Sequence, residues 1–174
     1  DNGGLEQGAM NMLLTADCCK DVHTLECTNV GASERALRCV EENPEVLTKV
    51  TSLRQTFLYT EQGLRALGNS RLMQQLTHLS LGGGRMRPEH LGLVLHKDVV
   101  PRLKTLELKD MVPNFYPDDY NLQDVQDWAL TALQNSGLGG QLEEFAPGAL
   151  LHPALETWLH DNKIASTEGV TRIA

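Results

Sequence analysis

The chain of 174 residues lacks long apolar runs, has few aromatic side chains and carries an excess of negative charge. No segment approaches the roughly 20 consecutive apolar residues that a helix needs to cross a bilayer. The first residues have neither the basic start nor the apolar stretch of a signal peptide. Aromatic residues make up 5% of the chain, and the formal net charge is −8. Because an acidic surface repels phosphate groups, we expect neither nucleic acid nor a membrane as the partner.

Motifs of metal binding and catalysis are also missing. The histidines form no His-x-x-x-His pair and the cysteines form no Cys-x-x-Cys pair, although zinc sites commonly rely on such spacings. Adjacent acids such as Glu143 and Glu144 point to opposite sides of a strand, which is typical of solvated charge. The sequence therefore predicts no metal, no cofactor and no enzymatic activity.

An internal repeat is the main feature that is present. Four segments share an apolar pair, two mostly polar residues and then three apolar-leaning positions spaced i, i+3 and i+5. They begin at Cys18, Val46, Leu72 and Val99, at steps of 28, 26 and 27 residues. A degenerate fifth copy starts at Leu142, which lies 39 residues after the equivalent position Leu103. A period of this length is typical of repeat proteins.

The repeat predicts a strand in each copy and a helix between copies. The last positions of each copy alternate as in a strand, so that Leu79 and Leu81 point inward while Ser80 points outward. Helix-like spacing recurs over residues 34–40, 62–67, 88–95, 125–133 and 153–160, and we expect Gly68 and Gly137 to end two of these helices. The predicted fold is α/β: a curved solenoid with an inner parallel sheet of about five short strands and outer helices.

The two central copies, Leu76-x-x-Leu79-x-Leu81 and Leu103-x-x-Leu106-x-Leu108, resemble leucine-rich repeats of the ribonuclease-inhibitor and F-box-associated kinds. The resemblance covers about residues 10–150. It departs from the family where an asparagine or cysteine normally ties one turn to the next: these positions are Val30, Leu58, Gly84 and Met111. We therefore expect the loops between repeats to be held in a different way.

We expect one domain over residues 1–160, with an insertion loop at 111–123 and a frayed tail at 161–174. Because the chain opens directly into a helical pattern and stops soon after one, we expect a segment of a longer protein. Three of its cysteines (Cys18, Cys19 and Cys27) stand where other copies have leucine, methionine or valine. They and Cys39 are predicted to be reduced core thiols in a cytoplasmic or nuclear protein, with a disulfide or a metal or redox role as the alternatives.

Two surfaces are candidates for partner binding. Outward positions of the strands are polar and of both signs, and Arg54, His78, Glu107 and Lys109 are the binding candidates among them. The alternative is a plain solvated sheet face. In the insertion, the aromatic residues of a proline-stiffened loop are typical of interface hot spots; they are Phe115, Tyr116 and Tyr120. The alternative is that this loop folds back over the edge of the repeats.

A third candidate is an anion site before the helix expected at Pro88. It would use the glycines and arginines of one loop, Gly82, Gly83, Gly84, Arg85 and Arg87, where backbone amides and a helix start can meet a phosphate. The loop lacks the Lys-Ser/Thr ending of a nucleotide-binding P-loop, and three glycines also permit a tight turn without a ligand.

The function that these patterns favour is a protein–protein interaction module. The resemblance to F-box-associated repeats implies substrate recognition for ubiquitin ligation, although these residues contain no F-box motif. The alternatives are a phosphate-binding regulator or enzyme that uses the glycine loop, and a structural assembly module. The sequence does not indicate the oligomeric state.

Overall fold

A computed structural model describes residues 19–27, 37, 39–43, 45–56, 61–82, 88–109 and 122–167. Within these residues the chain is an α/β protein with a single parallel sheet of six strands, whose order in the sheet follows their order in the chain. The strands are β1 (Thr24–Cys27), β2 (Ser52–Thr56), β3 (His78–Gly82), β4 (Thr105–Lys109), β5 (Glu144–Ala146) and β6 (Ala165–Ser166).

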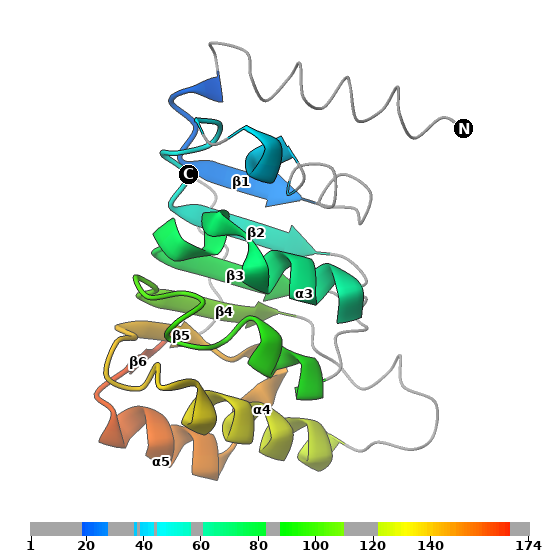
Figure 1. Ribbon diagram of the computed structural model, residues 1–174. Helices are drawn as coiled ribbons and strands as arrows, with labels where there is room; N and C mark the ends of the chain where they lie inside the picture. Colours follow the sequence, from blue (N-terminus) through cyan, green and yellow to red (C-terminus); the bar gives the residue numbers. More distant parts are fainter. Residues whose placement is uncertain are drawn as a thin grey trace.

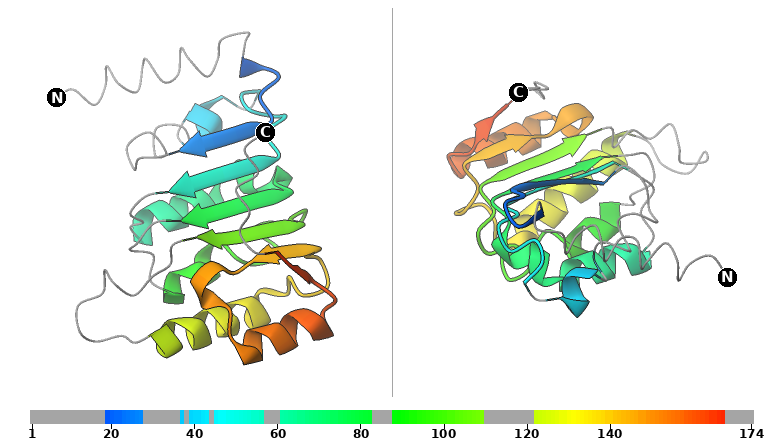
Figure 2. Two further views of the ribbon diagram at one scale, coloured as in Figure 1. Left: turned by 180° about the vertical axis from the view of Figure 1, so that it is seen from behind. Right: turned by 90° about the horizontal axis from the view of Figure 1, so that it is seen from above.

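The helical segments connect successive strands. They are α3 (Glu61–Asn69), α4 (Leu122–Ser136) and α5 (Pro153–Asp161), together with the 3₁₀ helices η2 (Arg71–Gln75), η3 (Pro88–Leu93) and η5 (Gly148–Leu150). Figure 1 shows α3, η3 and α4 on one face of the sheet, and the left view in Figure 2 shows the opposite face of β1–β4. None of the described helices is long and apolar enough to cross a membrane.

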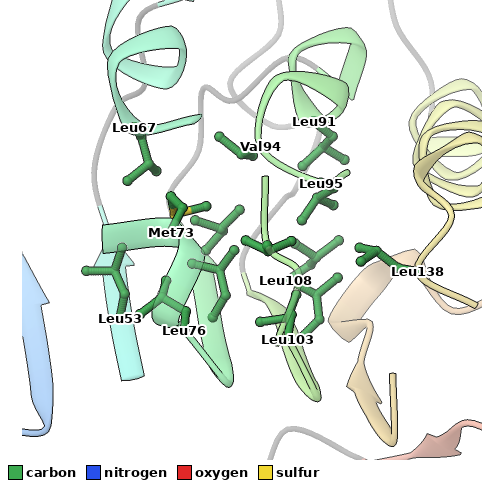
Figure 3. Packing of buried hydrophobic residues seen from close by; sticks show 14 of the residues in the cluster. Leu53, Leu67, Met73, Leu76, Leu91, Val94, Leu95, Leu103, Leu108 and Leu138 are labelled. Atoms are coloured by element: carbon green, nitrogen blue, oxygen red, sulfur yellow. The ribbon is translucent and has the colours of Figure 1, made fainter. Parts of the chain in front are cut away.

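The predicted alternation along the strands is confirmed. Leu53, Leu79, Leu106 and Phe145 are paired in register across β2–β5 and are at most 1% exposed. Leu67 of α3, Leu91 of η3 and Leu95 belong to the same buried cluster as these strand residues, and Figure 3 shows them with Leu53 and Leu108 between the sheet and the helices. One continuous apolar layer between sheet and helices therefore supplies the hydrophobic stabilisation.

Equivalent backbone bonds recur from copy to copy. The second residue of the apolar pair accepts a hydrogen bond from the amide three residues later, as in Leu47 with Val50 (3.2 Å) and Val100 with Leu103 (3.1 Å). Before each of the strands β1 to β4, one carbonyl accepts from two amides of the next copy. The Thr51 oxygen, for example, accepts from the amides of Thr77 (2.8 Å) and His78 (3.0 Å). The repeated sequence pattern thus forms a repeated turn.

Glutamine side chains tie neighbouring turns together. The amide group of Gln75 donates to the Leu47 and Val50 oxygens at 2.6 and 2.7 Å. Gln141 makes the same pair of bonds to Val100 and Leu103 at 2.7 and 3.0 Å. The Leu47 and Val100 oxygens thereby gain a second donor beside the turn amide, and the Val50 and Leu103 oxygens gain a side-chain donor. They differ from the usual asparagine of leucine-rich repeats in both residue type and position.

Several predicted elements differ in the structure. The segment expected to be a helix over residues 88–95 is the short 3₁₀ helix η3, and Gly92 within it disfavours a longer α-helix. The sheet has six strands where about five were predicted, because Ala165 and Ser166 pair with β5 in a segment expected to be a frayed tail. Two donated bonds hold them there, from the amides of Ala165 and Thr167 to the oxygens of Glu143 and Phe145.

Gly68 does not end its helix, which continues to Asn69. A Cβ atom at Gly68 would lie 2.2 Å from the Leu93 oxygen, so glycine is needed there for the close approach of α3 and η3. Gly137 follows α4 with a φ of 72°, which confirms the predicted helix end.

Candidate functional site on the open face of the sheet

The face of the sheet opposite α3, η3 and α4, which we call the open face, brings four of the sequence-predicted residues together. The strand register aligns Arg54 of β2 with Ser80 of β3 and Glu107 of β4. His78 lies two residues before Ser80, and Lys109 lies two residues after Glu107, so all five side chains share one face. Three neighbouring strands therefore supply a compact group of charged and polar side chains.

Glu107 is at the centre of this group. Its carboxylate pairs with the Lys109 ammonium at 2.8 Å and lies 3.6 Å from Nε2 of His78. Burial raises the pKa of this carboxyl, but contacts with Lys109 and Ser80 and the nearby positive charge outweigh burial, so the pKa lies below its ordinary value. Glu107 is therefore a stable anion whose charge Lys109 largely neutralises.

His78 is half-buried beside this ion pair. Burial lowers its pKa below the ordinary value of 6.5; Glu107 and Glu144 act against this shift, whereas Arg54 and Lys109 reinforce it. Its Nε2 is buried and makes no hydrogen bond. Because its pKa is lowered, the imidazole is uncharged at neutral pH.

Among the residues that the structure describes, none forms an ion pair or a hydrogen bond with Arg54. Its Nε is buried without a hydrogen bond, and no described carboxylate forms an ion pair with it. Glu26 is opposite Arg54 in the register but is exposed to solvent. The face thus combines one neutralised pair, Glu107 with Lys109, and one uncompensated guanidinium.

Ser80 was not among the sequence candidates, although its outward position was predicted. It is 2% exposed, between the longer side chains of Arg54 and Glu107 in the register. A serine in a strand gives no signal by itself. The register across three strands is needed to identify it as part of the group.

The remaining candidates lie largely outside the described residues. Gly82 is the last residue of β3, and η3 is a six-residue 3₁₀ helix in place of the α-helix start that the anion-site hypothesis required. The candidates outside the description are Gly83, Gly84, Arg85, Arg87, Phe115, Tyr116 and Tyr120.

A hollow lies on the helix side of the molecule, between η3 and α4. It has a volume of about 390 Å³ and is lined by Leu95, Trp128 and Ala132, with His96 and Asn135 as polar groups. The Trp128 side chain is 37% exposed. Its neighbour Ala129 is fully buried, and α4 contacts both η3 and η5.

Comparisons of this chain with protein-family models, curated proteins and solved structures find no match.

Proposed function

We propose that this chain is a curved, leucine-rich-repeat-like solenoid whose open face binds another protein. The recurrence of the same backbone bonds at Thr51, Thr77 and Lys104 supports the solenoid. Equivalent bonds at each step are what stacked repeats with a shared core require. The parallel strands in chain order and the helices on one face agree with this architecture.

The observation that carries the binding proposal is the group on the open face. Arg54, His78, Ser80, Glu107 and Lys109 come from three strands, and their exposure is lower than that of freely solvated side chains: the side chains of His78 and Glu107 are 22% and 16% exposed. Half-buried charges of both signs favour specificity and orientation of a protein partner. On a plain solvated sheet face, water would hydrogen-bond the Nε of Arg54, but here this atom is buried without a hydrogen bond.

The geometry favours binding over catalysis. The Ser80 hydroxyl contacts Glu107, and the imidazole of His78 is also directed at Glu107. A serine nucleophile would need the imidazole as its base. The lowered pKa of Glu107 makes that carboxylate a weak base.

The resemblance to F-box-associated repeats extends the proposal to substrate selection for ubiquitin ligation in the cytoplasm or nucleus. A thiol at Cys39 that forms no disulfide within the described residues agrees with a reducing compartment. Cys39 is fully buried, and burial raises its pKa. This extension depends on analogy between folds.

Affinity capture with charge-reversal variants tests the binding proposal. The bait is the full chain, either unchanged or with Arg54→Glu and Lys109→Glu combined, and bound proteins are identified by mass spectrometry. We expect proteins captured by the unchanged chain to be lost with the double variant. Ubiquitin-ligase subunits among them would support the F-box extension.

The matched control is Arg102→Glu, which reverses an exposed charge in the turn before β4. It should capture the same proteins as the unchanged chain, and all variants should keep the same far-UV circular dichroism. A third bait replaces Phe115, Tyr116 and Tyr120 by alanine, to test whether the insertion contributes. Identical capture by the double variant and the control would contradict binding at the open face.

A further inference from the structure

Arg54 points to the chemistry of the partner. A buried guanidinium N–H that lacks an acceptor is unfavourable, because the group has lost water without gaining a hydrogen bond. The Nε of Arg54 is in this state. An acceptor supplied by a partner would form the missing hydrogen bond and remove this unfavourable free energy. Binding is therefore favourable at the Nε of Arg54.

The groups around Arg54 determine the charge that fits. Glu107 is two strands away and already pairs with Lys109. Ser80, directly beside Arg54, contacts Glu107 with its hydroxyl, and His78 is uncharged at neutral pH because burial lowers its pKa. The guanidinium therefore keeps its positive charge with no described acid bound to it, and the complementary group is an anion.

We propose that Arg54 is the receptor for a carboxylate, so that the partner presents an aspartate or glutamate in a segment that lies across the open face. This inference rests on the proposed function and names the side chain that the site recognises. A guanidinium binds a carboxylate through two parallel hydrogen bonds. His78 lies in the adjacent row of the register, with its Nε2 3.6 Å from the Glu107 carboxylate, so Arg54 carries the recognition of the carboxylate.

The acidic residue should be isolated within the partner. Glu26 and Glu144 are exposed on the same face on either side of the group, and they repel additional negative charge. A run of acids is thus disfavoured, whereas a single acid with basic or neutral neighbours fits. This pattern separates the proposed partner from a polyacidic segment.

The test selects random twelve-residue peptides against the full chain at low salt and measures affinities by fluorescence anisotropy. We expect the binders to share one aspartate or glutamate. Changing it to the corresponding amide should weaken binding about 10- to 100-fold, the range for a hydrogen bond to a charged group. Arg54→Gln should cause a similar loss, while Arg54→Lys should retain part of the affinity.

A double-mutant cycle separates a direct pair from a general loss of charge. In the Arg54→Gln chain, the change of acid to amide in the peptide should have almost no further effect. Arg102→Gln serves as the matched control and should leave affinity unchanged. Thermal melting should confirm that each variant is folded.

Two kinds of failure can be distinguished. The assignment of Arg54 is overturned if peptides lose affinity for the Glu107→Gln or Lys109→Gln chain but not for the Arg54→Gln chain. It is also overturned if the acid-to-amide change in the peptide weakens binding equally to the unchanged chain and to the Arg54→Gln chain. In either case the proposal that the open face binds a protein remains. If no selected peptide responds to any variant of the open face, or if the library yields no binder, the proposed function fails together with the inference.

Discussion

At the scale of single residues, the open face shows how a sheet can hold charge at low exposure. Glu107 is stabilised as an anion by Lys109 and Ser80, and the adjacent His78 is kept neutral by burial. Arg54 has no such compensation. The group therefore contains one ion pair, Glu107 with Lys109, and one guanidinium Nε without a hydrogen bond.

His78 should make stability depend on pH. Because burial lowers its pKa in the folded state below the ordinary value of 6.5, the unfolded chain binds the proton more strongly. The free energy of unfolding should thus fall as the pH falls through about 6.5. Urea unfolding at about pH 7.5 and pH 5.5 should show a smaller loss for His78→Gln than for the unchanged chain.

The control for this measurement is His160→Gln, since the His160 side chain is 90% exposed. It should reproduce the pH dependence of the unchanged chain. Equal pH dependence of the His78→Gln and unchanged chains would show that His78 has no part in it.

Leu79 and Leu106 should be among the most sensitive core positions. Both are fully buried and adjacent in the register, so truncation removes apolar contacts and leaves a cavity. We expect Leu79→Ala and Leu106→Ala each to lower the free energy of unfolding by about 2–5 kcal/mol. Leu122→Ala, at a position 42% exposed, should cost less than about 1 kcal/mol in the same denaturation experiment. Losses below that value at both core leucines would contradict the register.

At the scale of elements, the contact between α3 and η3 depends on a missing side chain. Gly68→Ala places a methyl group against the Leu93 oxygen, and the backbone has to shift. We expect a loss of about 1–3 kcal/mol in stability. Gly92→Ala is the matched control, because a Cβ there meets nothing within 4 Å. Equal effects of the two substitutions would show that the close approach is unimportant.

The glutamine bonds between turns should contribute measurably to stability. Gln75→Ala leaves the carbonyls of Leu47 and Val50 without their side-chain donor, and Gln141→Ala does the same for Val100 and Leu103. We expect losses of about 1–3 kcal/mol for each substitution. Gln123→Ala, which removes an exposed bond within α4, should change stability by less than about 0.5 kcal/mol.

At the scale of the whole molecule, the sheet should be most stable in its middle. β3 is paired on both sides by five-residue strands, whereas the two residues of β6 pair with β5 alone. Because local opening is easiest where few bonds and little apolar area are lost, hydrogen exchange should be slowest in β3 and faster at Ala165. Similar protection at both places would indicate that the sheet opens only as one unit.

The sequence by itself determined the first five strands and their inward residues. A period of two within each strand and a period of about 27 between copies are local signals, and burial of one face follows directly from them. They were sufficient to predict the parallel sheet, the leucine row and the common face of Arg54, His78, Glu107 and Lys109.

Only the tertiary structure decided the features that depend on neighbouring elements. The exposure of Trp128, the need for glycine at Gly68 and the pairing of Ala165 with β5 arise from contacts between segments far apart in the chain. The lack of a hydrogen bond at the Nε of Arg54 also depends on the tertiary structure, because the adjacent strands determine which side chains lie beside it. Local patterns specify which way a residue points, but distances and partners emerge only when the elements pack.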